Sequence, residues 1–115
     1  MLALLASAEV VLLPVTVLGE LEAGFELGRR GRENRTVLAS FLEEPFVAVL
    51  PTTPEVARRY GQTFARLREA GTPIPTNDIW IAAAAIDAGG RLVTFDDHFA
   101  RVPGLDCLVL EPWTS

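Results

Sequence analysis

The chain has 115 residues, of which 50% are hydrophobic and 22% charged, and this fits one domain spanning residues 1–115 with no room for a second. All ten basic residues are arginine, which excludes lysine-based chemistry. With 15 acidic residues the net charge is −5, which argues against a passive basic nucleic-acid surface, although a bound divalent ion would change the local sign. The single histidine, His98, and the single cysteine, Cys107, exclude a histidine-rich metal site, an internal disulfide and a multi-cysteine zinc site.

The predicted elements alternate between helices and short apolar strands. In the first half of the chain, the patterns predict a short helix at 2–8, a strand at 10–13, helices at 16–30 and about 33–43, and a strand at 46–50. In the second half they predict a helix from 53 to about 71, and then a buried helix that follows the polar residues 76–78 and is closed at 89–90. A strand at 92–95, a helical turn at 96–101 and a strand at 107–110 complete the series. Thr53 and the 76–78 segment are the expected helix caps. This alternation predicts an α/β fold with a parallel sheet flanked by helices.

No segment of the sequence predicts membrane insertion or export. The apolar runs are shorter than the roughly 18 residues of a membrane span. The apolar start of the chain has no preceding Lys or Arg and is too short for a signal peptide. The lone cysteine fits a reducing compartment, so we expect a soluble cytoplasmic protein.

Four carboxylates are expected at one edge of the sheet. Asp96 and Asp97 directly follow the strand at 92–95, and Asp78 opens the helix that leads back into that strand. Glu20 lies in the early turns of the helix that follows the first strand. In a parallel sheet with helical crossovers, strand ends and helix starts meet at the rim where ligands bind.

Clustered carboxylates repel one another unless a proton or a cation lies between them. Oxygen ligands favour Mg²⁺ or Mn²⁺, and such an ion can polarise a phosphate and acidify a water, which is phosphodiester hydrolysis chemistry. Each acid also has a plainer interpretation, because Asp78 can cap a helix, Glu20 can be solvated and Asp96 can belong to a turn. His98 is expected to be a structural or surface residue rather than a catalytic base.

A group of arginines lies where the first two long predicted helices meet, at positions 29, 30, 32 and 35. Such a group is usually a solvated face, although it can also contact phosphates or an acidic partner.

Three blocks of sequence resemble a known family. They are PVTVLGEL at 14–21, PTNDIWIAA at 75–83 and LVTFDDHFARVPGL at 92–105. Together, and in this order, they resemble PIN domains of the VapC toxin type over essentially the whole chain. The resemblance implies a compact α/β ribonuclease that uses Mg²⁺ or Mn²⁺, usually dimerises, and is neutralised by an antitoxin inserted into its acidic groove.

The resemblance also assigns roles to residues. It places the metal-binding and catalytic acids at Glu20, Asp78 and Asp96, and it makes Asn77, Thr94 and Asp97 candidates for orienting water or ligands.

The chain departs from the family pattern at its start. Members of the family open with a central strand that ends in Asp-Thr-Asn, whose first Asp is a metal ligand, and no such segment precedes Met1. We therefore expect an N-terminally truncated sheet with two exposed inner edges. Either the true start lies upstream or the chain is a truncated, inactive product, and the intact remaining motifs favour an upstream start.

The sequence is compatible with three functions. The leading hypothesis is a Mg²⁺- or Mn²⁺-dependent endoribonuclease toxin of a type II toxin–antitoxin system. The main rival is a truncated, catalytically inactive PIN-like module that retains antitoxin binding or self-association. A phosphate-receiver or aspartyl-phosphatase enzyme is a third idea, which is weakened because such sites commonly use a lysine and this chain has none.

Overall fold

The computed structural model describes residues 3–6 and 10–111. Within these ranges the elements are β1 (Ala3–Ala6), β2 (Val11–Pro14), α1 (Val15–Leu27), α2 (Gly31–Leu42), β3 (Val47–Leu50), α3 (Pro54–Glu69), α4 (Thr76–Ala88), β4 (Arg91–Thr94), the 3₁₀ helix η1 (Asp97–Arg101) and β5 (Cys107–Val109). Most predicted strands and helices are therefore present, with ends displaced by one to three residues.

The strands form one sheet in the order β3-β2-β1-β4-β5. The pairs β2–β3 and β4–β5 are parallel, as a fold of strands linked by helices predicts. The α/β fold class is confirmed. The sheet is not wholly parallel, however, because β1 runs antiparallel to both of its neighbours.

Two predictions for the start of the chain are wrong. Residues 3–6 form a strand instead of part of a helix, and the rest of the predicted segment (residues 2, 7 and 8) lies outside the described residues. The middle of the sheet is not vacant, because Leu5 of β1 pairs with Leu12 of β2 and with Leu92 of β4. An apolar run this short makes a poor isolated helix, whereas as a strand it satisfies the backbone groups of both neighbours.

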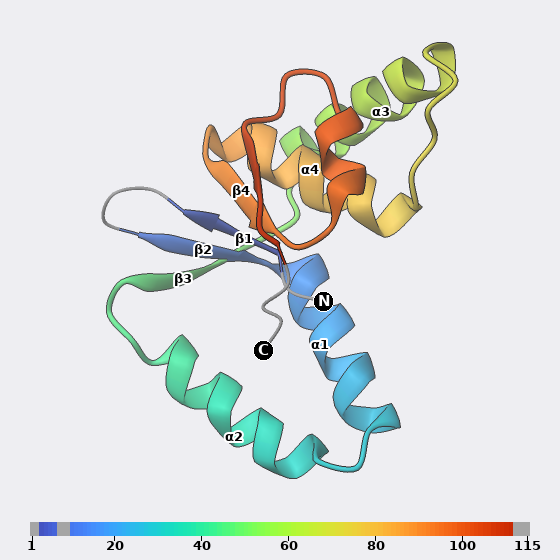
Figure 1. Ribbon diagram of the computed structural model, residues 1–115. Coiled ribbons are helices and arrows are strands. Elements are labelled where there is room, and N and C mark those ends of the chain that lie inside the picture. The colour runs from blue at the N-terminus through green and yellow to red at the C-terminus, as the bar shows by residue number, and fades with distance from the viewer. Residues whose placement is uncertain (1–2, 7–9, 112–115) are drawn as a thin grey trace.

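The helices lie on the two sides of the sheet (Figure 1). Helices α3 and α4 pack against each other on one side, while α1 and α2 extend from the other side as a bent arm. Helix α4 is largely buried, and residues 82–85 are all alanine, so the neighbouring elements can approach it closely. The main core is the cluster Leu13, Val17, Leu67, Ile74, Ile79, Ile81, Ala82, Ala85, Leu92, Phe99 and Val102.

The helix ends confirm one prediction and correct two. The Thr53 side chain accepts a hydrogen bond from the Val56 N–H, and Pro54 follows it as the first helical residue. Helix α1 ends before Gly28, whose N–H donates to Gly24 O, and not at the predicted residue 30. Helix α4 begins after an extended Pro75 with no side-chain cap, so Thr76 is its first helical residue.

Among the described residues, no helix has the length and apolar character needed to cross a membrane.

Candidate metal centre

Asp78 is a buried acid in the first turn of α4. The residue is only 5% exposed, and its backbone N–H donates to Pro75 O at 3.0 Å. A carboxylate in the first turn is favoured by the positive end of the helix dipole, which partly offsets the cost of burying it. The apolar faces of α4 draw this helix into the core, and Asp78 is buried along with its first turn.

Asp96 is held by hydrogen bonds at the end of β4. Its backbone N–H donates to the Thr94 side-chain oxygen at 3.1 Å, and its Oδ1 accepts from the His98 N–H at 2.9 Å. The second bond makes Asp96 the N-cap of η1. Thr94 is almost fully buried, so it holds the backbone of Asp96 in place, while the His98 N–H holds the carboxylate.

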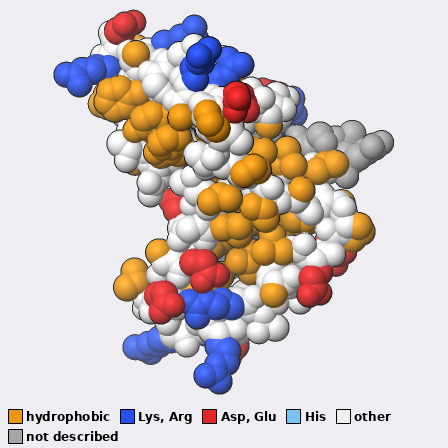
Figure 2. All heavy atoms as spheres, turned by 180° about the vertical axis from the view of Figure 1, so that it is seen from behind, with side chains coloured by type: hydrophobic (Ala, Val, Ile, Leu, Met, Phe, Trp, Pro, Cys, Tyr) orange, Lys and Arg blue, Asp and Glu red, His pale blue; other side chains and the backbone are white. Residues whose placement is uncertain are grey.

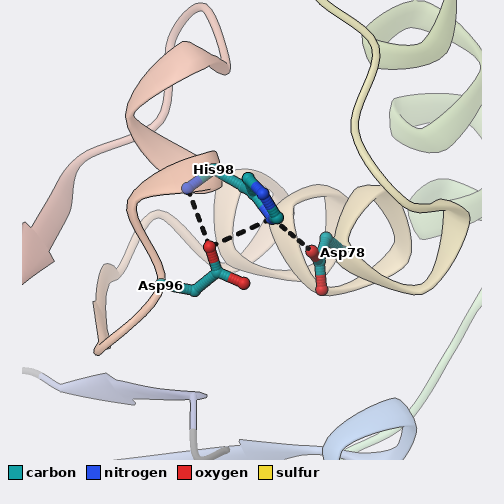
Figure 3. A group of neighbouring side chains, drawn as sticks. All are labelled: Asp78, Asp96 and His98. Atoms are coloured by element: carbon teal, nitrogen blue, oxygen red, sulfur yellow. Dashed lines mark hydrogen bonds and ion pairs between the residues drawn. The ribbon is translucent and has the colours of Figure 1, made fainter.

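His98 lies between the two aspartates (Figure 3). Its ring Nδ1 is 3.0 Å from Oδ1 of Asp96 and 3.5 Å from Oδ2 of Asp78. Although Nδ1 is buried, it makes a geometrically acceptable hydrogen bond with neither oxygen. The 3₁₀ helix η1 therefore directs the His98 ring, which is 38% exposed, towards the acidic cluster, and its expected structural or surface role stays a prediction.

The electrostatics of the cluster disfavour its negative charge. Burial, and then repulsion from Asp96, raises the pKa of Asp78, while the close polar contact with His98 acts in the opposite direction. Burial also raises the pKa of Glu20, and repulsion from Asp78 and Asp96 adds to the rise. This repulsion indicates that Glu20 of α1 belongs to the same electrostatic site.

The residues predicted to orient water or ligands differ in their burial, since Thr94 is buried whereas Asn77 and Asp97 are exposed. Thr94 supports Asp96 directly, as described above. Asn77 and Asp97 are exposed, and among the described residues neither belongs to the compact ligand group. In the arginine group, positions 29, 30 and 32 are exposed, while Arg35 pairs with Glu22 and Glu26 of α1.

The donor atoms of the cluster fit a divalent cation. One potential ligand atom from each of Asp78, Asp96 and His98 lies within 4.8 Å of the other two. Two carboxylates supply hard oxygen donors, and the buried Nδ1 of His98 lacks a hydrogen-bond partner. Strand β1, with the sequence ALLA, contributes no carboxylate to the site.

Comparison with known proteins identifies the family of this chain. The PIN domain family model matches residues 1–105. Ribonuclease VapC2 of Rickettsia felis is 30% identical over 113 residues, covering 97% of this chain and 81% of that protein. Ribonuclease VapC5 of Mycobacterium tuberculosis is 30% identical over 90 residues, or 78% of this chain and 67% of that protein.

Solved structures show the same likeness. The crystal structure of VapBC2 from Rickettsia felis bound to a promoter DNA fragment has a TM-score of 0.77 and 28% identity, covering 85% of this chain and 73% of the matched chain. DNA-bound VapBC from Salmonella typhimurium also has a TM-score of 0.77, with 29% identity over 85% of this chain and 74% of the matched one. The chain therefore belongs to the PIN domain family, and within that family it is of the VapC type.

His98 is the member of the cluster that sequence reasoning missed. A usable signal was present, because Asp96 and His98 are two residues apart directly after a strand. An aspartate in this position caps the turn by accepting the N–H two residues on, which is a local interaction. The direction of the ring toward α4 depends on tertiary packing and is not visible in the pattern.

Proposed function

We propose that the chain is a metal-dependent endoribonuclease toxin of a type II toxin–antitoxin system. The observation that carries this proposal is the meeting of Asp78 and Asp96, from separate elements, at one buried point of a VapC-type PIN domain. The ribonuclease names of its relatives support the RNA substrate. The proposed cofactor is Mg²⁺ or Mn²⁺, and the proposed compartment is the cytoplasm.

The chain's own residues have distinct parts in this proposal. Asp78, Asp96 and Glu20 are the proposed metal-binding and catalytic acids, of which the two aspartates lie in the compact ligand group. Thr94 fixes the backbone of Asp96. Exposed Asn77 and Asp97 are proposed to orient water or RNA from the solvent side. When bound, the divalent ion supplies Lewis-acid activation for phosphodiester hydrolysis.

Three partners are proposed, namely RNA, a cognate antitoxin and a second copy of the chain. The antitoxin is supported by the structural neighbours, which are VapBC structures. An apolar groove of about 320 Å³ between α1 and α2, which includes Phe25, Val37 and Phe41 in its lining, suits an apolar segment of such a protein. Size-exclusion chromatography with light scattering, with and without the co-expressed antitoxin, measures both protein associations.

An RNA cleavage assay tests the enzymatic part. We expect cleavage with Mn²⁺ or Mg²⁺ and none with EDTA. Asp96→Asn is expected to lower the rate by about 100-fold or more, because losing a ligand should cost at least as much as losing the residues that orient ligands. Full activity in EDTA, or in the variant, would contradict the metal mechanism.

Glu26→Gln is the matched control for this assay. It makes the same carboxylate-to-amide change on an exposed side chain of α1, so we expect it to cleave like the wild type. If the wild-type chain does not cleave RNA yet binds the antitoxin tightly, the rival hypothesis of an inactive binding module is supported instead.

A further inference from the structure

We infer that His98 is a nitrogen ligand of the cation, so that this centre prefers Mn²⁺ over Mg²⁺. This inference rests on the proposed function, which needs only a divalent ion, and it goes further by naming a nitrogen ligand and an ion preference. It begins from His98 Nδ1, which is buried and lacks a hydrogen-bond partner between two carboxylates. Buried polar nitrogens without partners are rare and need a physical explanation.

The distances around Nδ1 suit a shared ion better than a hydrogen bond. Neighbouring ligands of one ion with bonds of about 2.1 Å stand about 3 to 3.5 Å apart, depending on the coordination geometry. The measured separations from Nδ1 are 3.0 Å to Asp96 and 3.5 Å to Asp78. A hydrogen bond also needs the acceptor to lie along the N–H direction, and neither oxygen meets that condition.

The local backbone holds His98 in this position without help from an ion. Its own N–H donates to Asp96 Oδ1, so the capping bond that starts η1 also places the ring beside the same carboxylate. The next residue, Phe99, is fully buried and anchors η1 in the core. A ligand fixed by two such contacts needs little reorganisation when it binds an ion.

A mixed nitrogen and oxygen site changes the expected ion preference. Mg²⁺ is a hard ion that favours oxygen ligands, whereas imidazole suits first-row transition metals. Mn²⁺ accepts both kinds of donor, and later members of that series bind such sites more tightly. With two carboxylates and one imidazole, the centre should therefore discriminate against Mg²⁺.

Pulsed EPR on the Mn²⁺-loaded protein tests the ligand directly. His98 is the only histidine in the sequence, so labelling with ¹⁵N-histidine marks this one residue. The protein must be prepared without a polyhistidine tag. We expect nitrogen modulation from a directly bound imidazole, changed by the label and absent in His98→Ala.

Calorimetric titration with Mn²⁺ alone and with Mg²⁺ alone tests the preference. In His98→Ala we expect Mn²⁺ affinity to fall about 10- to 100-fold and Mg²⁺ affinity to change much less. His98→Asn is a second variant that keeps a polar side chain of similar size in case the alanine variant folds poorly. Arg101→Gln is the matched control, because it changes an exposed residue of the same 3₁₀ helix.

The outcomes separate this inference from the proposed function. If Mn²⁺ binds without nitrogen modulation, and His98→Ala binds both ions as well as or better than the wild type, His98 is a counter-charge that the ion displaces. The inference is then wrong while the proposed function stands. If the wild type binds neither ion, the proposed metal mechanism itself fails.

Discussion

Two groups of carboxylates in this protein differ in how their negative charge is balanced. Glu22 and Glu26 are well exposed, and Arg35 lies 3.0 and 2.7 Å from them. The side chains of Asp78 and Asp96 are only 7% and 17% exposed, and among the described residues neither forms an ion pair with an arginine. The first group carries its own cation in water, whereas the second faces only a histidine.

The difference shows why carboxylate number alone is a poor guide to a metal site. A solvated pair with a guanidinium gains little from a further cation, since water already screens its charge. A buried pair without a fixed counter-charge is costly in its ionised form, and a divalent ion relieves that cost. Burial combined with an incomplete charge balance therefore distinguishes the Asp78–Asp96 site.

The largest expected effect comes from Asp78→Asn. Mn²⁺ affinity should fall by about 100-fold or more, because a ligand is lost. The metal-free protein should melt at a higher temperature, since burial and Asp96 repulsion disfavour ionised Asp78. Calorimetry and thermal melts measure the two effects. Glu26→Gln should leave Mn²⁺ affinity unchanged, and equal losses in both variants would remove the distinction between the two groups.

A smaller effect is expected from pH. Asp78 and Glu20 have raised pKa values in the folded protein, so the folded state binds more protons than the unfolded state. The resulting destabilisation is absent below the ordinary pKa values, 3.8 for Asp78 and 4.5 for Glu20, and it grows as the pH rises above them. The metal-free wild type should therefore gain stability relative to Asp78→Asn as the pH is lowered from about 7 towards these ordinary pKa values.

Urea denaturation of both proteins at several pH values measures this difference. Saturating Mn²⁺ should reverse the trend for the wild type, because protons then compete with the ion for the same carboxylates. A pH-independent difference between the two metal-free proteins would show that Asp78 does not carry the unfavourable charge.

The smallest effect is expected from Arg35→Gln. This change removes the cation between Glu22 and Glu26, which are exposed and screened by water. The melting temperature should shift by about 2 °C or less, and by less still at high salt. Thermal melts at low and high salt measure it. A large, salt-independent loss of stability would contradict this prediction and show that Arg35 is needed to hold α2 against α1.

That arm also differs from the opposite side of the sheet in its apolar surface. Helix α4 buries most of its apolar side chains, whereas Val37 of α2 is 69% exposed and Leu27 of α1 is 89% exposed. Figure 2 shows apolar side chains gathered over the hollowed middle of the molecule, with charged groups at its ends. The contrast supports the proposal that the α1–α2 groove receives part of a protein partner.

Much of the fold was predictable because its signals are local. The Thr53-Pro54 start, the apolar run of α4 and the short strands at 46–50 and 92–95 each follow from side-chain spacing or capping chemistry. The start of the chain was not predictable in the same way. A four-residue apolar run has no periodicity that separates strand from helix, and the open backbone edges of β2 and β4 decide its structure.

The candidate site also combines features that are local in the sequence with features that depend on tertiary packing. By itself, the sequence determined that carboxylates follow a strand and begin a helix, because these positions are set by local order along the chain. Only the tertiary structure decided that Asp78 is buried, that Glu20 is repelled by both aspartates, and that His98 turns inward. Those outcomes depend on how α1, α4 and η1 pack on the sheet, since burial and interatomic distance are properties of the assembled core.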